Sequence, residues 1–141
     1  MSSYKKNGKL FPDYYYEKSE ADSDLDFLNY QKEITNNLPD EVILPPNLNF
    51  KLKIDYPLTT PFTCEVNTTK NGLTRRQLVE FIIKCYKQIY KEENKSTKVK
   101  PGRMGNSFNR NSTDGKYGIW GHDLGDLFLH TLVVKDNKLE V

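Results

Sequence analysis

Alternating apolar and polar positions predict a pair of strands near the middle of the chain. Residues 48–56 alternate strictly, which is typical of a strand with one face buried. Pro57 ends this strand, and a second alternation covers residues 62–66 after the turn residues 58–61. A hairpin is the simplest connection between the two.

The strongest local pattern predicts an amphipathic helix from Thr74 to about Glu93. Thr74 and Gln77 match a T-x-x-Q capping box, in which each residue satisfies a free backbone donor of the first turn. The apolar positions that follow recur at helical spacing, so we expect them to face the core. They are Leu78, Phe81, Ile82, Cys85, Tyr86, Ile89 and Tyr90.

Two weaker patterns precede these elements. Ser23 is a suitable N-cap for a short helix that ends before Leu38, because Asp24 and Asp26 would then lie in its first turn. Residues 42–46 end in two prolines, which lack backbone donors. We interpret that segment as an extended connector with apolar anchors rather than a central strand.

The end of the chain predicts a terminal hairpin. Its strands are expected at 127–134 and 139–141, with a turn at 135–138 between them. An outer strand of three residues leaves open N–H and C=O groups that invite pairing or cover. Two sources of such pairing or cover are open: a second copy of the chain, which would form a homodimer, and the N-terminal segment.

Together these elements predict an α+β fold: a small antiparallel sheet of about four strands, one long amphipathic helix packed on it, and a short N-terminal helix. The 141-residue length fits one domain, placed at 23–141. Residues 1–22 have no periodic apolar face and are interpreted as an N-terminal arm. Their run Tyr14, Tyr15 and Tyr16 is either a stacking platform for bases or part of an arm laid over the domain or a neighbouring subunit.

Composition narrows the class of protein. Mean hydropathy is −0.74, and neither an apolar run of membrane-spanning length nor a secretory signal is evident. We therefore expect an intracellular protein without membrane contact. Cys64 and Cys85 lack CxxC spacing and are interpreted as buried structural thiols. Ala occurs once and Arg four times, which points to an AT-rich genome.

The net charge of +2 is unevenly distributed, with acidic residues in excess at 13–41 and basic ones at 51–116. The loop 95–110 is the most basic connection and could bind phosphate groups, although a solvated loop is the simpler reading. Its candidate residues for nucleic-acid binding are Lys95, Lys98, Lys100, Arg103 and Arg110. Nucleic acid is thus an alternative partner.

Candidate chemistry gathers at residues 120–126. His122, Asp123 and Asp126 could hold a metal or polarise a water, which gives a small metal-dependent hydrolase as another alternative. A metal site needs three or four ligands, however, and the same residues could cap a turn instead. No phosphate-loop, dinucleotide, nucleophile-elbow or zinc-protease motif occurs. We expect no catalytic residue, metal or cofactor, and favour a non-enzymatic protein.

The segment at 114–127 reads DGKYGIWGHDLGDL. It resembles an uncharacterised family marked by YGIWGHDLxDL, found in large DNA viruses of amoebae, with similar proteins in plants, algae and bacteria. The resemblance covers roughly residues 56–141 and implies a viral or virion-associated protein of the host cytoplasm, with a host or viral protein as partner. Five of the residues that match the motif are the candidate ligand-binding residues: Tyr117, Trp120, His122, Asp123 and Asp126.

Overall fold

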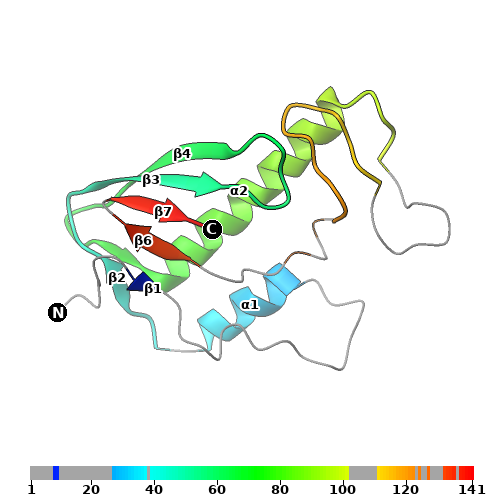
Figure 1. Cartoon of the computed structure of the whole chain (residues 1–141). Coiled ribbons are helices and arrows are strands. Elements are labelled where there is room, and N and C mark those ends of the chain that lie inside the picture. The colour runs from blue at the N-terminus through cyan, green and yellow to red at the C-terminus, as the bar shows by residue number, and fades with distance from the viewer. Residues whose placement is uncertain are drawn as a thin grey trace.

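The computed structural model describes residues 8–9, 27–37, 39–101, 111–122, 124, 127, 132–135 and 137–141. It confirms the α+β class (Figure 1). The elements are β1 (Gly8–Lys9), α1 (Phe27–Asn36), β2 (Val42–Leu44), β3 (Asn49–Ile54), β4 (Phe62–Asn67), β5 (Leu73–Thr74), α2 (Arg75–Ser96), β6 (Val133–Lys135) and β7 (Lys138–Glu140).

The main sheet has the strand order β1-β6-β7-β3-β4 within the described residues. The predicted hairpin is confirmed, because β3 and β4 pair antiparallel over their whole length, with Leu52 opposite Cys64. The alternation in β3 buries Phe50, Leu52 and Ile54 and exposes the residues between them. One pair of the sheet, β3 with β7, is parallel.

Helix α2 covers one face of this sheet (Figure 1). Its predicted start is confirmed, since Thr74 is the N-cap and both hydrogen bonds of the capping box with Gln77 are present. The expected apolar stripe is buried except for Phe81, which is half-buried. Val79 and Ile83 are buried as well, on a helix that also contacts α1.

The prediction that the last strand lies at the outside of the sheet is wrong. Figure 1 shows β7 between β6 and β3. It runs parallel to β3, and the Val141 N–H donates to the Lys53 carbonyl at 3.1 Å. The reason is that β3 and β6 each offer a row of backbone groups, and a three-residue strand between them satisfies both of its own sides.

Strands β1 and β4 are therefore the outer strands of the described sheet. Gly8 and Lys9, from the predicted arm, pair with β6. The predicted strand 127–134 is realised as the shorter β6, with Leu127 buried before it and residues 128–131 outside the described residues.

The two N-terminal patterns are realised in part. Helix α1 begins at Phe27, and Ser23, Asp24, Asp26 and Leu38 lie outside the described residues. Within the predicted connector, β2 pairs with β5 in a separate two-stranded sheet. Its Ile43 and Leu44 are buried, so they anchor this connection as expected.

Candidate functional site

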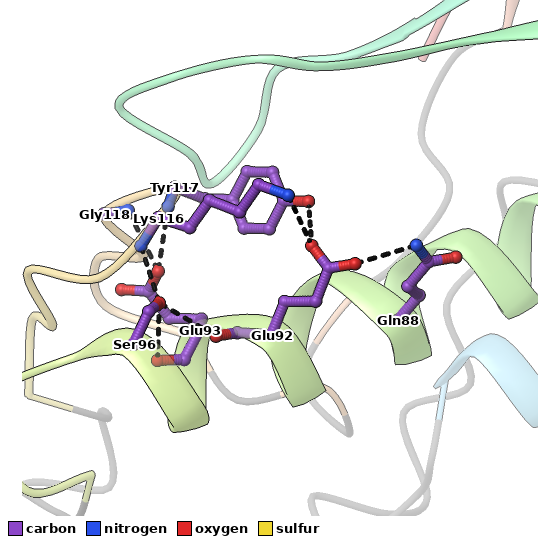
Figure 2. Close-up of polar contacts among 7 residues, drawn as sticks. All are labelled: Gln88, Glu92, Glu93, Ser96, Lys116, Tyr117 and Gly118. Atoms are coloured by element: carbon purple, nitrogen blue, oxygen red, sulfur yellow. Dashed lines mark hydrogen bonds and ion pairs between the residues drawn. The ribbon is translucent and has the colours of Figure 1, made fainter.

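A buried carboxylate near the end of α2 organises the loop that carries the motif. Glu93 is 0% exposed and lies between α2 and the loop at Lys116, Tyr117 and Gly118 (Figure 2). It accepts hydrogen bonds from the Thr113 hydroxyl (2.6 Å) and the backbone N–H groups of Gly115 (2.9 Å), Tyr117 (2.9 Å), Gly118 (3.2 Å) and Ile119 (3.3 Å). One side chain thus satisfies the donors of most of this loop.

These donors keep Glu93 ionised. Burial raises the pKa of the carboxyl, but the Thr113 hydroxyl and the backbone N–H groups outweigh that effect and leave the pKa below its usual value. Sequence analysis placed the end of the helix near Glu93 and missed this role. A signal was present, because Glu93 lies four residues after Ile89 and three after Tyr90, so it continues the buried stripe.

The neighbouring Glu92 binds the same loop from the helix surface (Figure 2). It accepts hydrogen bonds from the Tyr117 hydroxyl, from Lys116 Nζ at 3.1 Å and from Gln88 Nε2 at 2.8 Å. These contacts lower the pKa of Glu92 to about 2. Tyr117, predicted to bind a ligand, is buried, and its hydroxyl is used within the chain as a donor to Glu92.

The motif also joins the loop between β3 and β4. The Thr59 and Thr60 N–H groups donate to the Tyr117 carbonyl at 3.0 and 2.9 Å, and the Trp120 N–H donates to the Pro57 carbonyl at 3.1 Å. Gly118 has φ +65°, and a Cβ atom there would lie 3.1 Å from the Thr59 side chain. The positive φ favours glycine at this position, and a larger residue would also press on the Thr59 side chain.

At the end of this loop, Tyr56, Trp120 and His122 form what we call the aromatic corner. Tyr56 and Trp120 are 50% and 42% exposed, and their rings meet edge to face at 88° with centroids 5.0 Å apart. The Tyr56 hydroxyl is hydrogen-bonded to His122 Nε2. Beside the rings lies a shallow pocket of about 190 Å³, lined by Asp55, Tyr56, Leu58 and Trp120.

Buried tyrosines of α2 fix the backbone of this corner. Tyr86 donates to the Tyr56 carbonyl at 3.1 Å, and Tyr90 donates to the His122 carbonyl at 2.7 Å. Burial raises the pKa of Tyr86, so its hydroxyl stays a donor. The exposed rings consequently stand on a backbone that is hydrogen-bonded to the core.

The structure thus places Trp120 and His122 close together. Tyr56 lies with them, although the sequence predicted it only as a residue of the strand at 48–56. Asp123 and Asp126, predicted with them, lie outside the described residues. In the part of the chain that is described, no group of three His, Cys, Asp or Glu side chains is placed to hold a metal ion.

The described start of the predicted basic loop, at residues 97–99, is hydrogen-bonded to an acidic residue. The Asp114 carboxylate accepts hydrogen bonds from the Thr97 hydroxyl (2.9 Å) and the Lys98 and Val99 N–H groups (2.8 and 3.3 Å). These amides are thereby used within the chain rather than offered to a phosphate. Lys95, Lys98 and Lys100 are exposed, whereas Arg103 and Arg110 lie outside the described residues.

The two thiols are held in the protonated form. Cys64 is half-buried on β4 and Cys85 is buried on α2. Burial raises the pKa of both, that of Cys85 to about 12.

Fold and site together define a small α+β domain whose motif loop is bonded internally and displays an aromatic corner. No protein-family model matches the chain, and neither a curated protein nor a solved structure matches it. The resemblance of residues 114–127 stays a prediction. None of the described helices combines the length and apolar character needed to cross a membrane.

Proposed function

We propose that this protein is a non-enzymatic structural or protein-interaction component that acts as a homodimer. The observation that carries the proposal is the outer edge of β4. Among the described strands, none pairs with that side of β4, and the other outer strand, β1, is only two residues long. Edge strands with open backbone groups favour pairing with another chain.

The direction of the β4 backbone groups follows from β3. The Lys51 N–H donates to the Asn137 carbonyl, and the Lys53 carbonyl accepts from Val141, so these alternate residues of β3 face β7. The residues between them face β4, with Leu52 opposite Cys64. In an antiparallel ladder, Thr63 and Glu65 then direct their N–H and C=O groups outward.

The composition of β4 suits such pairing. It is six residues long and contains neither proline nor lysine, the residues that commonly protect an edge. A twofold axis at Cys64 would set Thr63 opposite Glu65 of the partner subunit, so the two glutamates would not face each other. The result would be one continuous sheet through both copies.

The contacts between Tyr117 of the motif and the end of α2 support a non-enzymatic role. Glu92, Glu93 and Tyr117 bind the loop to α2, which is architecture rather than chemistry on a substrate. The viral origin and the location in host cytoplasm and virion rest on the resemblance at 114–127 and on the AT-rich composition.

Light scattering at tens of micromolar tests the homodimer. We expect a mass of about twice 16.4 kDa for the native chain. Thr63→Pro removes one outward donor and should give a monomer, whereas Thr63→Val keeps the donor and should remain dimeric. Circular dichroism checks that both variants fold.

If Thr63→Pro does not fold, hydrogen exchange of the native chain gives the answer. The amides of Thr63 and Glu65 should gain protection as concentration rises into the dimeric range. A native chain that is monomeric at these concentrations contradicts the homodimer.

A further inference from the structure

We propose that the aromatic corner binds an organic cation of the alkylammonium type in the pocket beside Tyr56 and Trp120. This site goes beyond the proposed homodimer, because it lies on the loop after β3 and at the motif rather than on the outer edge of β4. It gives the motif a ligand chemistry.

The arrangement of the two rings is the first argument. Their planes are perpendicular and their centroids 5.0 Å apart, so they form an inside corner beside the pocket. An aromatic face carries negative potential and attracts a cation within about 6 Å of the ring centroid. Tyr56 and Trp120 both stay about half exposed, and small-molecule sites are lined predominantly by apolar and aromatic side chains.

Charge is the second argument. Asp55 is the one charged residue that lines the pocket within the described chain. Its carboxylate takes part in none of the ion pairs found among the described residues. Leu58, an apolar residue that is 4% exposed, also lines the pocket. Two rings, one carboxylate and one apolar residue suit a cation with a methylated surface, which loses little hydration when it binds.

Rigidity is the third argument. The Tyr56 hydroxyl is held by His122, and the backbones of Tyr56, Trp120 and His122 are hydrogen-bonded to Tyr86, Pro57 and Tyr90. The rings are thus positioned before a ligand arrives, and little ordering entropy remains to oppose binding. The pocket of about 190 Å³ accepts one small head group rather than an extended chain.

Trp120 is the chain's single tryptophan, so its emission and its indole N–H resonance report on this site alone. We would titrate the full-length protein with choline and with the neutral isostere in which carbon replaces the quaternary nitrogen. Choline should give a saturable change, and the isostere should bind at least about fivefold more weakly.

Three variants separate the contributions and keep the reporter. Asp55→Asn retains the shape and removes the charge, so choline affinity should fall at least about threefold. Tyr56→Leu removes one ring and should weaken binding about threefold to thirtyfold. Tyr56→Phe keeps the ring but loses the hydroxyl that His122 holds, so its affinity for choline should lie between those of the native chain and of Tyr56→Leu.

The amide of N-acetyl-trimethyllysine presents the same head group on a protein side chain. If this amide binds more tightly than choline, the natural ligand is a methylated lysine of a protein. If choline binds more tightly, the natural ligand is a small molecule. Equal binding of choline and its isostere, or no saturation with either cation, overturns the cation site. The mass of the native chain, measured separately, decides the homodimer whichever result is found.

Discussion

At the residue scale, Glu93 shows how one buried charge shapes a loop. A carboxylate without partners in an apolar interior is strongly unfavourable, and here the loop at 113–119 supplies the partners. The same contacts bring the backbone of the motif to a defined place on α2. Trp120 and His122 follow directly in the chain, so the aromatic corner depends on this carboxylate without including it.

We predict that Glu93→Gln destabilises the fold by about 3 kcal/mol in urea unfolding. The neutral amide turns its NH₂ group toward backbone donors and leaves some of them unsatisfied. Glu92→Gln is the control, since Glu92 is partly exposed and its ion pair with Lys116 is screened by solvent. It should cost at most about 1 kcal/mol, and equal losses in both variants would contradict the role given to Glu93.

At the element scale, α2 is determined by local sequence at its start and by packing along its length. Thr74 Oγ1 accepts from the Gln77 N–H at 3.2 Å, and Gln77 Oε1 accepts from the Thr74 N–H at 2.9 Å. The buried stripe then packs on the sheet. Because α2 also supplies Glu92, Glu93, Tyr86 and Tyr90, its position determines where the motif loop lies.

We predict that Thr74→Ala lowers the free energy of unfolding by about 1 kcal/mol, since it removes the cap acceptor. Thr74→Ser preserves that oxygen and should leave stability nearly unchanged. Thermal and urea unfolding of both variants measure the difference. A serine variant as unstable as the alanine variant would show that the threonine methyl group, not the cap, is responsible.

At the scale of the whole molecule, Glu92 and Glu93, the carboxylates that bind the loop at 113–119, make the free energy of unfolding depend on pH. Glu92 and Glu93 have lower pKa values in the folded protein than in an unfolded chain, so the unfolded state binds more protons as the pH falls. Their stabilisation is complete above the usual carboxyl range near 4.5 and is lost as the pH falls toward about 2.

We therefore predict a melting temperature that is steady near neutral pH and falls between about pH 5 and pH 2. Glu92→Gln should flatten part of this fall, because the pKa of Glu92 itself is lowered to about 2. Scanning calorimetry across this range measures both curves. A native melting temperature that does not change in acid, or a steeper fall in the variant, would contradict the linkage.

The sequence by itself determined the features that local periodicity encodes. The alternation in β3 and β4, the cap at Thr74 and the stripe of α2 each depend on neighbours within a few residues, and each was predicted correctly. The motif at 117–127 could also be identified from the sequence, because it is a continuous run of residues.

Tertiary structure alone decided how distant groups meet. The place of β7 inside the sheet depends on β3 and β6, which no pattern in three residues reveals. Tyr56 meets His122 across 66 residues, and Glu93 finds its donors 20 to 26 residues away. Such pairings depend on how the chain folds around a shared core. Each polar group buried there needs a hydrogen-bond partner, and that partner can come from any part of the chain. No periodic pattern in the sequence therefore reveals these pairings.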